Sequence, residues 1–209
     1  MSIDPGDVSG DGSDRDRIIE AAYSCLVEPH AGAVSVAAVL TRAGLSTRAF
    51  YRHFASKDAL FLAMLRGESD WLAQRLDQIA DDFDGLPVDQ LRAWVAQVFD
   101  LLRDPRRRMR AKVLDSDEVS AARGYRTARV QCQTDGERSL ATILRRGLGQ
   151  GAFPLTKPEQ DAVAIAAVVG REMTRPGIGD EWEEVQAGVV DFALRAVGAQ
   201  AACRECGCA

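Results

Sequence analysis

The sequence predicts an all-α protein. Apolar residues recur at spacings of three and four along most of the 209 residues, and no segment shows the convincing alternation of a strand. Serine, proline and glycine stand where helices start and stop. Neither a repeat of about 20–50 residues nor an apolar run of about 18 residues is present. We therefore expect about nine helices and no membrane-spanning segment.

Composition limits the possible partners. The chain has 26 Lys and Arg against 31 Asp and Glu, a net charge of −5, which excludes an evenly basic coat for nucleic acid. Residues 1–13 repeat Asp and Gly without apolar periodicity, so we expect a disordered acidic tail rather than a secretion signal. These features predict a cytoplasmic protein, whose five cysteines are free thiols.

The first helix should begin near Ser13 or Asp14. Its apolar positions continue to Val27, and it ends there because a residue before proline disfavours the α conformation. Ser35 is placed to cap a short second helix, and Gly44 is placed to end it in a left-handed conformation.

Ser46 can then cap a second short helix, from Thr47 to about Phe54. Two short helices joined by a tight turn containing glycine are typical of a helix-turn-helix, whose second helix enters the DNA major groove. Ser56 caps a long helix that runs from Lys57 towards Ile79.

The rest of the chain continues as helices. The DGLP break at 84–87 precedes an amphipathic helix, and Pro105 starts another. Further helices are expected at about 120–148, 158–174 and 180–197, the first of them weakened by two glycines.

The last two helices are apolar on more than one face, so they need cover on more than one side. A second copy of the chain would supply it, and small residues would permit close helix approach; a central position within one chain is the alternative. The expected dimer interface comprises Ala166, Gly170, Val185, Gly188, Val189 and Phe192.

Residues 41–57 carry four cations and no acid, a local charge of +4 in an acidic chain. Such a cluster favours binding to DNA phosphate through counterion release. Helical spacing places Thr47, Arg48 and Tyr51 on the outer face, and Ala49 and Phe50 on the inner face. A solvated basic face on a structural hairpin is the alternative.

Residues 35–60, with AGLST, FYRHF and SKDAL, resemble the DNA-binding region of the tetracycline-repressor (TetR) family of transcriptional regulators. The resemblance implies a DNA-binding domain at 14–56 and a C-terminal effector-binding and dimerisation domain at 57–198. It also implies a homodimer that leaves a palindromic operator when a small effector binds.

The resemblance assigns DNA contacts to Ser35, Thr47, Arg48, Tyr51, Arg52, His53 and Lys57. Arg48 is the best base reader, because a guanidinium can bond bidentately to guanine. Lys57 and Tyr51 would chiefly hold phosphate. Ala37 stands where some members have a polar or basic side chain, which predicts weaker reading from the second helix.

An apolar or aromatic effector is expected, together with no cofactor and no bound metal. The aromatic and methionine residues that could line its pocket are Trp71, Trp94, Phe99, Met109, Tyr125 and Met173. Taken singly, each is better explained as ordinary core, and periodicity cannot distinguish a pocket wall from core. The sequence has no nucleophile elbow, phosphate-cradling loop or paired metal-ligand helix, so no enzyme activity is expected.

Two further clusters have two interpretations each. Residues 103–112 hold six cations and one acid, and either attract phosphate or form a solvated face paired with nearby acids. Cys203, Cys206 and Cys208, in the tail at 199–209, either form a redox or metal site or belong to a flexible tail.

The leading hypothesis is a ligand-responsive repressor. A sensor with the same fold that does not act through DNA, and an activator, are the alternatives.

Overall fold

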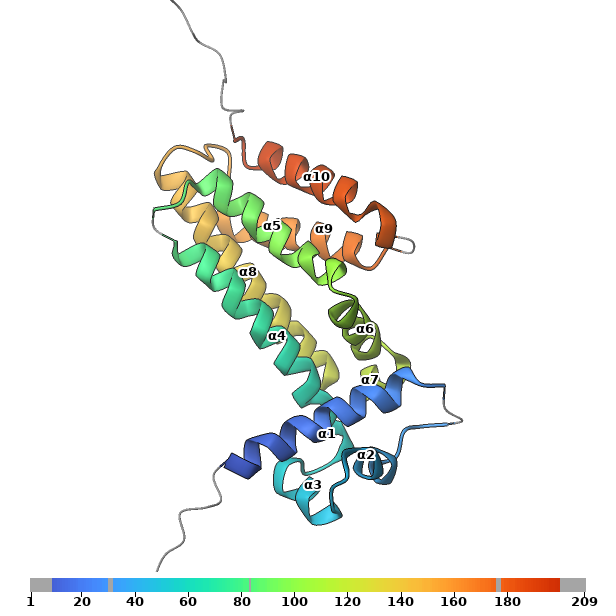
Figure 1. Cartoon of the computed structure of the whole chain (residues 1–209). Coiled ribbons are helices and arrows are strands. Elements are labelled where there is room, and N and C mark those ends of the chain that lie inside the picture. The colour runs from blue at the N-terminus through green and yellow to red at the C-terminus, as the bar shows by residue number, and fades with distance from the viewer. Residues whose placement is uncertain (1–8, 30–31, 83, 176–177, 200–209) are drawn as a thin grey trace, which may run out of the picture. The chain divides into compact units, whose positions relative to one another are not determined.

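The computed structural model describes residues 9–29, 32–82, 84–175 and 178–199 (Figure 1). Within these ranges the chain forms ten helices and no strand, which confirms the all-α prediction. No helix in the described ranges is both long and apolar enough to cross a bilayer. The first eight residues of the predicted acidic tail, and the three cysteines of the C-terminal tail, lie outside these ranges.

The chain divides into two compact units. Unit 1 contains Met1–Glu68 and Arg106–Arg129, and unit 2 contains Ser69–Pro105 and Val130–Ala209. Unit 1 therefore includes the predicted DNA-binding domain and adds the start of the long helix and a later segment of the chain.

The first helices of unit 1 are α1 (Ser9–Val27), α2 (Val36–Ala43) and α3 (Thr47–His53). The α1 helix begins before the predicted start near Ser13, so the last residues of the predicted tail are helical. The prediction takes Ser13 or Asp14 as the cap of the helix, but the backbone is already helical from Ser9. The predicted ends of α2 and α3 agree with the structure.

The α4 helix (Lys57–Asp81) crosses from unit 1 into unit 2, and the Ser56 hydroxyl caps it by accepting from the Ala59 amide at 3.1 Å. Unit 1 also contains most of α6 (Pro105–Leu114), all of α7 (Asp117–Ser120) and the first turn of α8 (Tyr125–Gly149).

One predicted helix is wrong at its start. The segment expected to be helical from about Ser120 is interrupted, and α8 begins only at Tyr125. Gly124 adopts a φ of 91°, which is incompatible with a continuing right-handed helix. The four-residue α7 helix before this break is the element that brings the number of described helices to ten.

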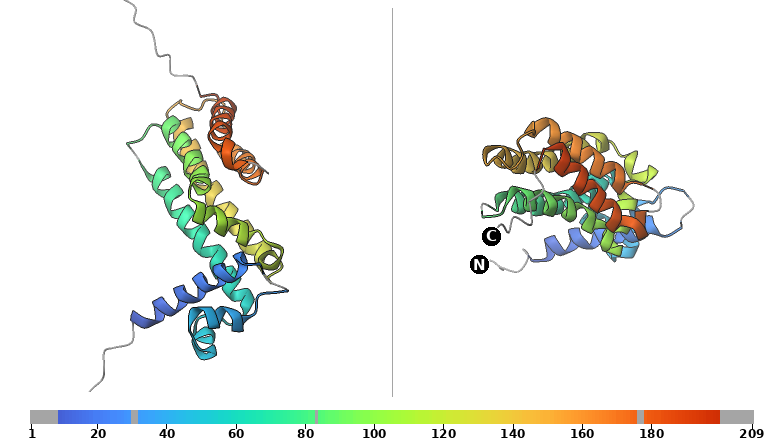
Figure 2. Two further views of the ribbon diagram at one scale, coloured as in Figure 1. Left: turned by 45° about the vertical axis from the view of Figure 1, so that its right-hand side comes forward. Right: turned by 90° about the horizontal axis from the view of Figure 1, so that it is seen from above.

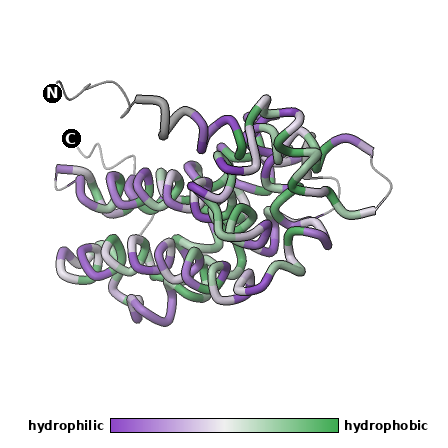
Figure 3. Tube along the Cα trace, turned by 90° about the horizontal axis from the view of Figure 1, so that it is seen from below, coloured by the Kyte–Doolittle hydropathy of each residue, from purple (hydrophilic) through white to green (hydrophobic). Residues whose placement is uncertain are grey.

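Unit 2 packs α5 (Pro87–Arg103), α9 (Pro158–Met173) and α10 (Ile178–Ala196) with the remainders of α4 and α8 (Figures 1 and 2). Hydrophobic and hydrophilic segments alternate along the helices (Figure 3), as amphipathic packing requires. A single core joins all five helices, with Phe99, Leu140 and Ile165 among its most buried side chains.

Side chains from two other helices cap the C-terminus of α4. The Gln90 amide donates to the carbonyls of Ile79 and Asp82 at 3.0 and 2.5 Å. The Arg146 guanidinium donates to the carbonyls of Ala80 and Asp82, at 2.7 Å each, and to the Gln90 side-chain oxygen at 2.9 Å. These bonds satisfy carbonyls that a helix end otherwise leaves without partners.

Candidate DNA interface

The turn between α2 and α3 has the geometry that the sequence predicts. The Ser35 hydroxyl accepts from the Ala38 amide at 3.1 Å, and the Ser46 hydroxyl accepts from the Ala49 amide at 3.2 Å. Gly44 ends α2 with a φ of 64°, a left-handed conformation that favours glycine. Serine side-chain caps therefore start both helices, and the left-handed glycine separates them.

The α3 helix is held by its inner face. Phe50 and Phe54 are buried, with ring centroids 5.6 Å apart, and the neighbouring Ala49 is buried as well. This packing fixes the rotation of the short helix about its axis. The outer face is consequently presented by the unit in a defined orientation.

Four of the predicted contact residues lie on that outer face: Thr47, Arg48, Tyr51 and Arg52 are all exposed. Tyr51 is 61% exposed although its ring rests edge-on against Phe50, with centroids 5.4 Å apart. No described residue pairs with the Arg48 guanidinium. The geometry thus presents two guanidinium groups, a phenol and a hydroxyl on one short helix.

Ser35 and His53 differ from these four. Ser35 is exposed at the start of α2, where its oxygen serves as the helix cap. His53 is only half-exposed, and its ring lies 6.2 Å from that of Phe54. Of the predicted contacts on α3, His53 is therefore the least accessible.

The sequence-level patch of four cations is partly neutralised in the folded unit. Arg42 makes hydrogen bonds of 2.7 and 2.5 Å to the Glu28 carboxylate. The hydrogen bond from Arg42 lowers the pKa of Glu28 below its ordinary value, so this acid is ionised at neutral pH. The Lys57 ammonium lies 2.9 Å from the Glu118 carboxylate and donates to the Val34 carbonyl at 3.1 Å.

In this conformation the Lys57 side chain has partners of its own, and its contact with phosphate stays a prediction. Its ammonium is committed to two partners within unit 1, and it also lies 5.4 Å from the centroid of the Phe61 ring. The reason is long-range: Glu118, 61 residues further along the chain, packs beside the start of α4.

Sequence reasoning also missed Arg17 and Glu28. Arg17 donates to the Ala43 carbonyl at 2.7 Å and so satisfies the end of α2. Neither residue belongs to a motif, and each acts through a tertiary contact. No local signal in the sequence distinguishes them from other exposed charges.

The basic run at 103–112 is paired with acids in unit 1. Arg107 lies 3.1 Å from Glu68, and Arg110 lies 2.6 Å from the same carboxylate. Arg106 binds Glu20 at 2.8 Å, and Arg110 also pairs with Glu20. For these three arginines the structure favours the solvated, acid-paired interpretation over phosphate attraction.

Glu20 shows the electrostatic effect of this pairing. Partial burial raises its pKa, but hydrogen bonds from Arg106 and Arg110 outweigh the burial and hold the pKa below the ordinary value of 4.5. The cluster therefore stays fully ionised at neutral pH and ties α6 to α1.

The predicted pocket residues divide between the two units. Met109 and Tyr125 belong to unit 1, whereas Trp71, Trp94, Phe99 and Met173 belong to unit 2. Trp94 and Phe99 are buried in the core of unit 2, and the Trp94 indole donates to the Ser139 hydroxyl at 2.8 Å. Both positions fit ordinary core.

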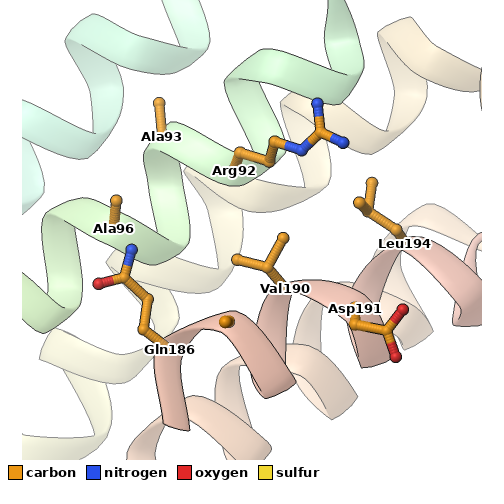
Figure 4. Close-up of a pocket in the computed structure, with 8 residues that line it drawn as sticks. Arg92, Ala93, Ala96, Gln186, Val190, Asp191 and Leu194 are labelled. Carbon is orange, nitrogen blue, oxygen red and sulfur yellow. The ribbon is translucent and has the colours of Figure 1, made fainter. Parts of the chain in front are cut away.

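An open groove instead lies between α5 and α10 within unit 2. Its volume is about 540 Å³, and Figure 4 shows Arg92, Ala93 and Ala96 on α5 across from α10. Val190 and Leu194 supply the apolar side from α10. None of the predicted pocket residues lines it.

The predicted dimer residues divide between surface and core. Gly170 and Gly188 are exposed, Phe192 is 38% exposed, and Ala166 and Val185 are half-buried. Val189 is only 4% exposed and belongs to the core of unit 2, so the single chain offers little of its surface to a partner. Val189 directly follows the exposed Gly188, and the rotation of the helix between successive residues turns Val189 towards the core.

Comparison with known proteins bears on the same region. Residues 18–64 match the family profile described as "Bacterial regulatory proteins, tetR family". The chain is 26% identical over 151 residues to the HTH-type transcriptional repressor KstR2 of Mycobacterium tuberculosis, covering 71% of this chain and 72% of that protein.

Solved structures share the fold. The SmeT–triclosan complex superposes with a TM-score of 0.75 at 23% identity, covering 88% of this chain and 91% of that one. The TetR family transcriptional regulator PfmR from Thermus thermophilus gives a TM-score of 0.62 at 25% identity, covering 87% and 95% of the two chains. The helix order of both units therefore has precedent.

Proposed function

We propose that the chain is a TetR-family transcriptional regulator and that it represses transcription by binding a palindromic operator as a homodimer. Its relatives are transcriptional regulators, and the chain is a regulator rather than an enzyme. The similar protein KstR2 is a repressor, which supports repression over activation for this chain. Its DNA target makes the cytoplasm its site of action.

The exposed face of α3 carries the proposal. A recognition helix must be rigidly held and must present side chains that reach base edges in the major groove. The buried Phe50 and Phe54 hold the helix in place. The exposed side chains of Arg48 and Thr47 would extend to the bases. Arg48 would bind guanine O6 and N7 bidentately, a contact that contributes about 1–3 kcal/mol of base discrimination. Tyr51 would bind the neighbouring phosphate.

The α9 and α10 helices support the dimer. Val163 on α9 is 50% exposed and Phe192 on α10 is 38% exposed, so a second copy of the chain could cover large apolar side chains of both helices. Figure 2 shows the two helices side by side. A two-fold dimer through this face would present two copies of α3, which matches the symmetry of a palindromic operator.

We place effector binding in unit 2. The groove between α5 and α10 combines an apolar floor with Arg92 and Asp191 at its margins, which suits a small and largely apolar molecule with one polar group. The structurally similar SmeT was solved with triclosan, which supports a small-molecule effector. A ligand that binds the DNA-incompetent state more tightly would release the operator.

The test begins with sequencing of genomic fragments that the full chain retains at low salt, followed by footprinting of the enriched site. The Arg48→Ala variant should lose about five- to 150-fold in affinity for the site and should relax base preference at one position of each half-site. Arg145→Ala is the matched control, because it removes the same charge from an exposed surface pair in unit 2.

Three outcomes would contradict the proposal. A protein that retains no fragment at low salt would be a sensor that acts without DNA. Equal losses for Arg48→Ala and the Arg145→Ala control would exclude α3 as the reading helix. A reporter that falls in expression when the gene is deleted would show activation instead of repression.

A further inference from the structure

A bridge of three partners lies at the start of α4 in unit 1. The Glu118 carboxylate oxygen lies 2.9 Å from the Lys57 ammonium and accepts from the Val34 amide, also at 2.9 Å. Lys57 in turn donates to the Val34 carbonyl at 3.1 Å. One acid on α7 thus holds both the first residue of α4 and the residue just before the cap of α2.

Glu118 pairs with a cation, Lys57, that lies at a position suited to binding DNA phosphate. Lys57 opens α4, where helix amides and the helix dipole also favour an anion. Its side chain is 31% exposed, so the ammonium is within reach of solvent, whereas the Glu118 side chain is only 17% exposed. A phosphate at this place would meet a cation that is already paired and a carboxylate that repels it.

We propose that Glu118 is an intramolecular competitor of DNA phosphate for Lys57, and that it sets the DNA affinity of the chain below what its cations would otherwise give. This inference rests on the proposed DNA-binding function. A phosphate at Lys57 must either share the ammonium with Glu118 or displace it, and in both cases the carboxylate remains beside the phosphate. Both effects weaken the complex.

The contacts also explain why a carboxylate on α7 holds this position in the folded unit. Val119, the next residue, is completely buried and anchors the short helix. Glu118 is directed by that anchor towards Val34, whose amide it satisfies. Displacement of α7 would therefore break the bridge and free Lys57, so the position of this four-residue helix tunes DNA affinity.

Glu118→Gln is the informative variant. The amide oxygen of Gln can still accept from the Val34 amide and from Lys57, so the local fold is retained while the charge is removed. We expect the Glu118→Gln variant to bind operator or genomic DNA about three- to tenfold more tightly than the unaltered chain at about 0.15 M salt. The same comparison in a Lys57→Gln background should show no more than a small part of this gain.

Glu159→Gln is the matched control, because Glu159 is an exposed acid of unit 2 that pairs with Arg145 and its replacement changes net charge equally. Its effect on DNA affinity should be close to zero. Circular dichroism and thermal unfolding of each variant verify that the fold is intact.

The possible results are distinct. Unchanged or weaker DNA binding by Glu118→Gln, with an intact fold, would overturn the competition and make Glu118 a structural support. An undiminished gain in the Lys57→Gln background would overturn the role of Lys57. If the unaltered chain and the Glu159→Gln control bind no DNA at low salt, the proposed function fails, and the inference that rests on it fails too.

Discussion

Gly188 offers a test of the dimer in which two effects have opposite signs. The residue is exposed in the interior of α10, and a Cβ built there would have no neighbour within 4 Å in the chain itself. Gly188→Ala should therefore stabilise the isolated subunit by about 0.8–1 kcal/mol, the difference in helix propensity between the two residues. For a chain of this size that raises the unfolding midpoint by about 2–4 °C.

The same methyl group has the reverse effect if a second α10 or α9 helix packs closely over Gly188. Excess volume at a tight helix contact destabilises it by about 1–3 kcal/mol. The dissociation constant of the dimer should then rise by about five- to 150-fold. Sedimentation across a dilution series measures this constant, and urea unfolding below that concentration measures the subunit.

Gly67→Ala supplies the control. Gly67 is likewise exposed in the interior of a helix, α4, and a Cβ there also has no neighbour within 4 Å. It should give the same gain in subunit stability with no change in dimerisation. Equal dissociation constants for the Gly67 and Gly188 variants, both matching the unaltered chain, would refute the placement of Gly188 in the interface.

Three further predictions follow from the packing. Gly44→Ala should destabilise unit 1 by about 1 kcal/mol, because its φ of 64° strains any residue with a side chain; a stability equal to that of the unaltered chain in urea unfolding would contradict this. Ser139→Ala should lower stability by about 1–3 kcal/mol, because it leaves the buried Trp94 indole without its acceptor, and adding Trp94→Phe should recover part of that loss in a double-mutant cycle. The pKa of Glu20 is lowered in the fold, so its ion pairs stabilise the fold at pH values above the unfolded pKa, near 4.5, and this stability is lost as pH falls through the lower folded pKa. Glu20→Gln should therefore make the free energy of unfolding fall less steeply with decreasing pH. An acid slope equal to that of the unaltered chain would contradict the assignment.

Local chemistry explains which parts of the fold were predictable. Ser35, Ser46 and Ser56 act through the amides three residues ahead, so their roles are visible in the sequence. Gly44 was predictable for the same reason. Gly124 is one of the two glycines expected to weaken the helix at about 120–148, but the sequence does not show that its backbone leaves the helical region and separates α7 from α8.

In the candidate site, too, features set by local sequence were predictable and features set by distant residues were not. Helical spacing on seven residues placed Thr47, Arg48 and Tyr51 on the outer face of α3. The state of Lys57 depends on Glu118, far along the chain, and periodicity carries no information about such pairs. The burial of Val189 in unit 2 is not visible in the sequence, because an apolar residue at the edge of a helix face fits a core and an interface equally well.

The cap on the end of α4 has a mechanical consequence. Because Gln90 and Arg146 hold the last carbonyls, the final turn of α4 cannot fray without breaking contacts of α5 and α8 as well. The terminal turn therefore opens together with the surrounding helices and not as a loose end. We therefore expect a displacement at this end to move α4 as a rigid helix, because unwinding of the last turn would break these hydrogen bonds.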